Sequence, residues 1–145
     1  MGLVGASLEL PHPADRVYRV ASRVDTLPEW LPEVTAASLL DAPLAAGSRV
    51  SLRLGPAGRG AEVVGRVTEF RPPTLLGITG EGGPLRVVVR TTLAAAGDRT
   101  RVGVTIDVKA APLVGFVARE AERRINAELP AALERLRALV DAEPA

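Results

Sequence analysis

The chain has 145 residues, of which 47% are hydrophobic and 24% are charged, the composition of an ordinary globular domain rather than of a disordered chain. Its 18 basic and 17 acidic residues leave a net charge of +1, which removes the electrostatic basis for binding nucleic acid. Because the chain has no cysteine and a single histidine, His12, we exclude disulfides, thiol nucleophiles and thiolate or histidine-rich metal sites, and we expect neither a metal nor a cofactor.

The sequence carries no targeting signal that we can identify. Its N-terminus lacks a basic segment, and its uncharged stretches are far shorter than the roughly 20 residues of a membrane-spanning helix. All but one of the 18 basic residues are arginines, the exception being Lys109, and alanine is abundant, which is typical of GC-rich bacterial coding. We therefore expect a cytoplasmic bacterial protein with a single domain over residues 1–145.

The first third of the chain predicts one strand and two short helices. Apolar and polar residues alternate over residues 3–10, which indicates a half-buried strand. Prolines end this strand, and apolar residues at three- and four-residue spacing then predict an amphipathic helix over residues 13–24. Residues 25–34 contain two prolines and Trp30, so they have room only for a turn and a brief second helix.

The middle of the chain predicts an antiparallel meander. Short turns separate segments in which apolar residues alternate with polar ones, so one face of the sheet is apolar and the other is solvated. The segments with this alternation are residues 49–54, 62–70, 75–80, 86–93 and 102–109. We expect another strand over residues 35–41, which makes six or seven strands in all.

The last element is a long helix over about residues 113–140. Apolar residues recur at every fourth position from Leu113 to Leu133. Four residues advance the helix about 40° beyond a full turn, so the apolar stripe drifts around the axis and the helix must curve or kink. Pro130 lies where a kink would return the stripe to one surface. One long helix packed on one curved antiparallel sheet is an α+β architecture.

Short motifs follow one another along the chain. They are Val17-Tyr18 with Asp25 and Glu29-Trp30, Gly47-Ser48-Arg49-Val50, Val67-Thr68-Glu69-Phe70-Arg71-Pro72-Pro73, and Gly97-Asp98-Arg99-Thr100-Arg101-Val102. They resemble the V-W…D…W, G-x-R-V, V-x-E-[YF]-x-P-P and G-x-x-T-x-V motifs of the polyketide cyclase/dehydrase group of the START-like (SRPBCC) superfamily. The resemblance implies a helix-grip fold, in which a curved antiparallel sheet wraps around the long C-terminal helix and two short helices follow the first strand.

A weaker resemblance is to the G subunits of carbon monoxide dehydrogenases. It rests on Leu54-Gly55-Pro56 and Gly80-Glu81-Gly82-Gly83. The cysteine-proline-glycine element that is typical of those proteins after the first helix is missing, and Leu31-Pro32-Glu33 stands in its place.

The helix-grip resemblance implies a cavity between the concave face of the sheet and the long helix. The alternation directs these side chains inward: Val50, Leu52, Leu54, Val63, Val67, Val87, Val89, Thr91, Leu93, Val102, Val104, Ile106 and Val108. This interior contains almost no ionisable group, so it favours an apolar ligand over acid–base chemistry.

Candidate site residues lie on the inner strands and along the long helix. The expected ligand-binding residues are Trp30, Leu52, Leu54, Val67, Val87, Val89, Thr91, Phe116, Val117, Glu120 and Arg124. Arg124 and Tyr18 are weak catalytic candidates, Arg124 to stabilise an enolate and Tyr18 to donate a proton. The assignments of Arg124, Tyr18 and Trp30 each have a structural alternative, which for Tyr18 is packing. Glu120, Arg124 and Glu128 have the four-residue spacing of an ordinary exposed charge ladder, and Trp30 is equally suited to anchoring the second helix to the sheet.

Three functions remain open on these observations. The first is binding of a small hydrophobic molecule (lipid-like, aromatic or polyketide-like) in an internal cavity. The second is an aromatase/cyclase acting on a poly-β-ketone, in which a shaped pocket supplies rate through proximity. The third is an accessory role like that of the dehydrogenase G subunits. The sequence leaves open the ligand's identity, whether the protein is an enzyme, and the oligomeric state.

Overall fold

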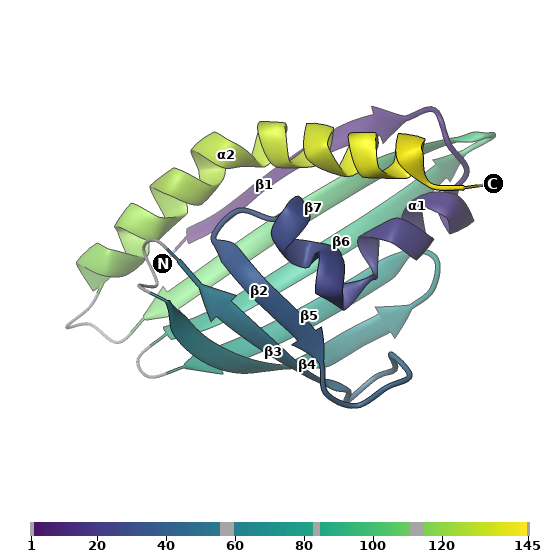
Figure 1. Ribbon diagram of the computed structural model, residues 1–145. Helices are drawn as coiled ribbons and strands as arrows, with labels where there is room; N and C mark the ends of the chain where they lie inside the picture. Colours follow the sequence, from purple (N-terminus) through teal and green to yellow (C-terminus); the bar gives the residue numbers. More distant parts are fainter. Residues whose placement is uncertain (1, 56–59, 83–84, 111–114, 145) are drawn as a thin grey trace.

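The computed structural model describes residues 2–55, 60–82, 85–110 and 115–144. Over these residues the chain forms one sheet, two α-helices and a 3₁₀-helix, η1 (Figure 1). The elements in chain order are β1 (Gly2–Leu10), α1 (Ala14–Ala21), η1 (Val24–Glu29), β2 (Val34–Leu39), β3 (Arg49–Leu54), β4 (Ala61–Arg71), β5 (Leu75–Gly82), β6 (Leu85–Ala96), β7 (Arg99–Ala110) and α2 (Gly115–Ala142). The α+β helix-grip architecture expected from the sequence is confirmed.

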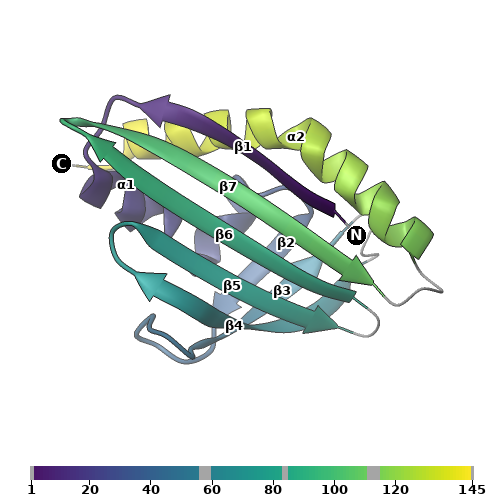
Figure 2. The ribbon, with the colours of Figure 1, turned by 180° about the vertical axis from the view of Figure 1, so that it is seen from behind.

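The sheet has seven antiparallel strands in the order β1-β7-β6-β5-β4-β3-β2. Strands β2 to β7 follow the chain as a meander, whereas β1 joins the far edge by pairing with β7, Leu8 opposite Val102. The sheet curls so that α2 lies across its concave side, with α1 and η1 on the same side (Figures 1 and 2). The concave side of the sheet therefore faces the helices.

Element boundaries differ from the expected ones where backbone geometry overrides the apolar pattern. The helix expected over residues 13–24 ends at Ala21, because Arg23 has an extended backbone (φ −74°, ψ 108°) and η1 starts after it. Strands β6 and β7 run on to a two-residue turn at Gly97, whose φ of 67° favours glycine. The strand expected over residues 35–41 spans Val34–Leu39.

Helix α2 is continuous through Pro130 and changes direction partway along its length (Figure 1). Proline removes one helical hydrogen bond and crowds the preceding turn, which bends a helix. The buried side chains of α2 are Ile125, Leu129, Ala132, Leu133, Leu136 and Val140. After Pro130 their spacing shortens from four residues to alternating three and four, which keeps the second half of α2 on the sheet.

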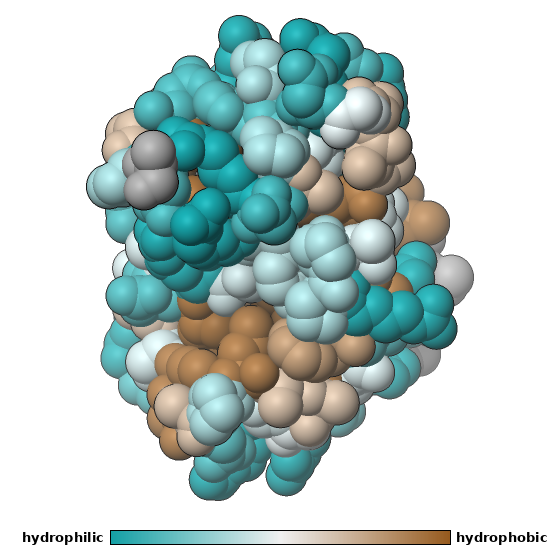
Figure 3. Space-filling view, turned by 90° about the vertical axis from the view of Figure 1, so that its right-hand side faces the viewer, coloured by the Kyte–Doolittle hydropathy of each residue, from teal (hydrophilic) through white to brown (hydrophobic). Residues whose placement is uncertain are grey.

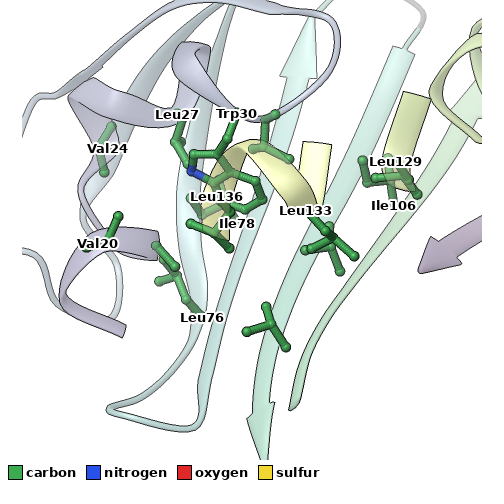
Figure 4. Packing of buried hydrophobic residues seen from close by; sticks show 14 of the residues in the cluster. Val20, Val24, Leu27, Trp30, Leu76, Ile78, Ile106, Leu129, Leu133 and Leu136 are labelled. Carbon is green, nitrogen blue, oxygen red and sulfur yellow. The ribbon is translucent and has the colours of Figure 1, made fainter. Parts of the chain in front are cut away.

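The second half of α2 covers the densest part of the core. Leu133 and Leu136 are within 1% of full burial, and Leu136 lies beside Trp30 and Ile78 in Figure 4. On β7, which α2 crosses, Val102 and Val104 are fully buried. This end of the sheet is therefore filled by side chains.

Polar contacts fasten the same end. Arg16 on α1 donates to the backbone carbonyls of Val140 and Glu143, which supplies a cap for the C-terminus of α2. His12 Nε2 lies 2.6 Å from Asp141 Oδ1, and Arg23 forms a bidentate pair with Glu143. The hydrogen bonds from Arg23 hold the pKa of the Glu143 carboxyl below its usual range.

The outer face of the molecule is largely hydrophilic. Its strand arginines pair with neighbouring acids, among them Arg90 with Glu69 at 2.6 Å and Arg53 with Glu62 at 2.7 Å. Figure 3, which views the right-hand end of Figure 1, shows mainly hydrophilic residues in its upper half and a broad apolar area in its lower half. None of the helices in the described ranges is both long enough and apolar enough to cross a membrane.

Candidate functional site

A cavity lies between the concave face of the sheet and the first half of α2. Its volume is about 80 Å³, and it is partly open to solvent. Its walls are formed by Leu31, Pro32, Glu33, Val34, Leu52, Leu54, Val63, Ile78, Gly80, Val87, Val89, Ile106, Val108, Ala121 and Ile125. Apart from Glu33, these residues have apolar side chains or, at Gly80, none.

The strand residues reach the cavity because of their alternation. Leu52 and Leu54 on β3 share a face, as do Ile78 and Gly80 on β5. At Gly80 a Cβ would lie 3.6 Å from a methyl of Val63 and 4.0 Å from a methyl of Leu52, which is ordinary contact. The missing side chain of Gly80 therefore contributes directly to the empty space.

The position of the cavity follows from how α2 crosses the sheet. Leu54, Val87 and Val89 point inward yet keep part of their surface accessible. Val102 and Val104, which also point inward, have no accessible surface at all. The concave face is thus packed at one end and hollow at the other, beneath the half of α2 that precedes Pro130.

A second, smaller cavity of about 30 Å³ adjoins the first. The two have Leu31, Val34, Leu52, Ile78 and Val89 in common as lining residues. The smaller cavity extends toward α1 and η1, where Ala21, Leu27, Leu76 and Thr91 complete its wall. The hydroxyl of Thr91 is the polar side-chain group that this extension offers.

The expected ligand-binding residues divide into three groups. Leu52, Leu54, Val87 and Val89 line the larger cavity and Thr91 the smaller one. The residues that are not among the lining residues of either cavity are Trp30, Val67, Glu120 and Arg124. Phe116 and Val117 belong to α2, but their side chains lie outside the described part of the structure.

Trp30 and Val67 are components of the core. Trp30 has no accessible surface, and its backbone carbonyl accepts a hydrogen bond from Arg135 at 3.0 Å. Its indole ring lies between Leu27 and Leu136 in Figure 4. Val67 is 2% exposed. Trp30 thus anchors the segment after η1 to α2 and the sheet, which is the structural role considered for it from the sequence.

The charged residues of α2 do not form the expected ladder. Glu120 pairs with Arg123 at 3.1 Å, and Arg124 Nε lies 3.9 Å from Glu33 Oε2. The hydroxyl of Tyr18, on α1, is buried without a hydrogen-bond partner in the described structure, and burial raises its pKa. Tyr18 is not a lining residue, so the structure does not bring the two catalytic candidates, Arg124 and Tyr18, to one wall.

The segment Leu31–Val34 is the part of the site that sequence patterns missed. It includes Glu33, the one ionisable residue among those that line the larger cavity, so this wall has almost no ionisable group, as expected. Glu33 has a left-handed backbone (φ 66°), and its carbonyl accepts a hydrogen bond from Gly55 at 3.1 Å. The available signal was the resemblance to the dehydrogenase G subunits, in which a glycine takes this position. Glycine is the residue that adopts positive φ without strain.

The cavity has the composition of a site for an apolar ligand and lacks that of a metal site. Within the ranges that the structure describes, no three His, Asp or Glu side chains are grouped so as to hold a metal ion. Apolar walls with a few polar groups are typical of small-molecule sites in which hydrophobic burial supplies affinity and polar groups set orientation.

Comparisons with known proteins find the same fold in solved structures. TTHA0849 from Thermus thermophilus has a similar structure, with a TM-score of 0.79 and 22% identity over 99% of this chain and 100% of that one. The Zhui aromatase/cyclase from Streptomyces sp. R1128 gives a TM-score of 0.72 at 17% identity, over 97% of this chain and 93% of that one. A START superfamily protein from Mycobacterium smegmatis gives 0.66 at 18% identity, over 92% and 98%.

At these identities the structural likenesses establish the fold alone. No curated protein matches the sequence. A family model described as polyketide cyclase / dehydrase and lipid transport, however, matches residues 1–141, which is nearly the whole chain. The chain belongs to this polyketide cyclase / dehydrase and lipid transport family.

Proposed function

We propose that the protein binds a small apolar molecule in the cavity beneath the first half of α2. The observation that carries the proposal is the hollow end of an otherwise packed concave face, with walls that are apolar except at Glu33. Burial of a ligand's apolar surface there is favourable by about 25 cal/mol per Å², before the costs of ordering the ligand are subtracted.

The size of the cavity limits the ligand. Pockets for drug-sized molecules measure about 300–1,000 Å³. The space of about 80 Å³ is well below that range, which favours a small molecule or one end of a longer one. We therefore propose a one-ring aromatic molecule, or one end of a longer chain, as the bound group.

An aromatase/cyclase activity is the second candidate. The observation in its favour is that Glu33, a lining residue, pairs with Arg124. A carboxylate can act as a general acid or base, and a guanidinium can stabilise an enolate. Against it stands the cavity size, since a poly-β-ketone chain must be folded inside the pocket if the pocket is to supply proximity. Ligand binding without turnover is thus the better supported function.

The test is calorimetric titration of the purified protein with toluene, preceded by native mass spectrometry for any molecule already bound. We expect saturable one-to-one binding that weakens about tenfold or more in Gly80→Val, whose methyl groups occupy the cavity. Gly80→Ala should give an intermediate loss. Val64→Ile, which adds a methyl on the exposed outer face of β4, is the matched control and should bind as the parent protein does.

Two results would contradict the proposal. One is an empty protein that binds neither toluene nor other small apolar compounds. That result would favour the accessory role considered from the sequence. The other is binding that is equally strong in Gly80→Val and in the parent protein, because that ligand would be elsewhere.

A further inference from the structure

The smaller cavity continues the apolar site toward α1 and η1. It shares five lining residues with the larger cavity, and those that line the smaller one alone are Ala21, Leu27, Leu76 and Thr91. Its volume of about 30 Å³ exceeds the roughly 10–15 Å³ that one water molecule requires. A small polar group of a ligand therefore has room here, next to an apolar body in the larger cavity.

Thr91 has the polar side chain of the smaller cavity, since the other described residues that line it are all apolar. It lies on β6 with the same alternation as Val87 and Val89, which line the larger cavity. Its partners across the sheet are Leu76 on β5 and Val104 on β7, which are 4% and 0% exposed. Thr91 therefore stands on the concave face of the sheet, in the wall of the site.

The hydroxyl of Thr91 has no hydrogen-bond partner among the described residues, although Thr91 is only 5% exposed. It differs from the hydroxyl of Tyr18, because the Thr91 oxygen is not one of the unpartnered atoms that packing seals completely. A hydroxyl in an apolar interior is costly unless it is hydrogen-bonded, and a valine would have nearly the same shape without that cost. The hydroxyl is thus available to a group that enters the smaller cavity.

The walls of the smaller cavity also restrict the charge of that group. None of the described residues that line it is ionisable. A carboxylate or an ammonium group would lose its hydration there without gaining an opposite charge. An uncharged hydroxyl or carbonyl loses less hydration, and it regains a hydrogen bond because the hydroxyl of threonine both donates and accepts.

We infer that Thr91 anchors the ligand by a hydrogen bond to an uncharged oxygen, a hydroxyl or a carbonyl, which enters the smaller cavity while the apolar remainder occupies the larger one. The inference rests on the proposed function, because it names the ligand class and its orientation in the same site. The apolar walls supply affinity, and Thr91 is the specificity-determining residue.

The test compares toluene with phenol, which has a hydroxyl in place of the methyl group, by calorimetric titration at neutral pH. Thr91→Val keeps the shape of the wall and removes the hydroxyl. It should weaken phenol binding about tenfold and leave toluene binding unchanged or slightly tighter. Each probe is compared between two proteins, so the different hydration of the two probes cancels. Thr91→Ser, which retains a hydroxyl, should keep the parent's ratio of phenol to toluene affinity.

Thr92→Val is the matched control, the same substitution at the next residue of β6. Thr92 is exposed, and its hydroxyl donates to the carbonyl of Gly103 at 3.4 Å, so this variant should bind both probes as the parent does. A second measurement needs no variant. In the parent protein, phenol should cause saturable shifts of the methyl resonances of Ala21, Leu27 and Leu76, which line only the smaller cavity.

Benzoate and benzylamine test the charge restriction, and each should bind the parent protein about tenfold more weakly than phenol, or not at all. Tighter binding of either one than of phenol overturns the uncharged ligand class.

The remaining outcomes separate the inference from the function on which it rests. If Thr91→Val changes phenol and toluene binding equally, or changes neither, the inference is wrong and the apolar site stands. Phenol binding that leaves the methyl groups of the smaller cavity unshifted overturns the orientation. Failure of toluene and phenol alike to bind the parent protein overturns the proposed function and the inference together.

Discussion

Two buried hydroxyl groups of this protein have opposite surroundings. Thr100 is fully buried, and its Oγ1 donates a hydrogen bond of 2.7 Å to the carbonyl of His12. The hydroxyl of Tyr18 is buried without a partner in the described structure. A buried polar group is costly unless it is hydrogen-bonded, so the first hydroxyl stabilises the fold and the second does not.

We predict that Thr100→Val lowers the free energy of unfolding by about 1–3 kcal/mol, because the His12 carbonyl loses its donor. Tyr18→Phe should leave that free energy unchanged or raise it by up to about 1 kcal/mol. Urea unfolding followed by circular dichroism measures both values. A larger loss in Tyr18→Phe than in Thr100→Val would show that the tyrosine hydroxyl has a partner that stabilises the protein.

The backbone of Glu33 permits a second test at this scale. Glu33→Gly and Glu33→Ala both remove the carboxyl and its pair with Arg124, but only glycine relieves the positive φ. We expect Glu33→Gly to be more stable than Glu33→Ala by about 1 kcal/mol in urea unfolding. Equal stabilities would mean that residue 33 is not held in the left-handed region.

Glu33 also shows where prediction from sequence ends. Alternation along β3 and β6 correctly predicted that Leu52, Leu54, Val87 and Val89 face inward, because the side chains of a strand repeat with a period of two. Glu33 lies in a segment without a repeat, between η1 and β2. There the direction of a side chain depends on one backbone angle that no periodicity encodes.

At the scale of elements, the loop between β2 and β3 explains one of the family-like motifs. Gly47 has a φ of 86°, and the hydroxyl of Ser48 contacts the backbone of residues 41–45. Arg49 donates to Asp41 from both its backbone and its side chain, at 2.9–3.0 Å. The motif Gly47-Ser48-Arg49-Val50 therefore stabilises the loop that leads into β3.

The same loop leads to a prediction about pH. The side-chain hydrogen bonds from Arg49, with the backbone one, lower the pKa of Asp41 from 3.8 to about 2. Because the folded state binds this proton more weakly than the unfolded chain, the stabilising contribution is present above pH 3.8 and is lost as the pH falls toward about 2. Thermal unfolding of the parent protein and of Asp41→Asn across this range measures it. The parent should be the more stable at neutral pH, and the difference should vanish near pH 2.

A difference that stays constant across that range would assign the effect of Asp41→Asn to something other than titration of this carboxyl. Glu69 and Glu143 also have lowered pKa values, through Arg90 and Arg23. They are present in both proteins, so their titration cancels in the comparison.

Helix α2 was the element most fully predictable from the sequence. The four-residue apolar repeat drifts around the helix axis, which predicted a bend, and Pro130 was the predicted position of that bend. What the repeat did not reveal is that the two halves differ in role. Ala121 and Ile125, in the first half, line the cavity, whereas Leu133, Leu136 and Val140, in the second half, pack in the core. That division depends on how far the sheet curls beneath each half, which is a property of the assembled strands.

At the scale of the whole molecule, the fold is closed at one end and hollow at the other. The contacts of His12, Arg16 and Arg23 with the end of α2 fasten α1 to the closed end. The pairing of β1 with β7 joins segments almost the full chain apart, and no local pattern predicts such pairing. Alternation predicted both strands, but neither their pairing nor the size of the cavity was predicted from the sequence.

The measurement that tests the central claim most directly is a methyl NMR titration of the protein with toluene. We predict saturable shifts for methyl groups of the hollow end, Leu52, Ile78, Val89 and Ile125, and unchanged resonances for Val102, Leu136 and Val140 at the closed end. Saturable shifts confined to the closed end or to the outer face of the sheet, or no saturable shifts, would contradict the assignment of the cavity as the ligand site.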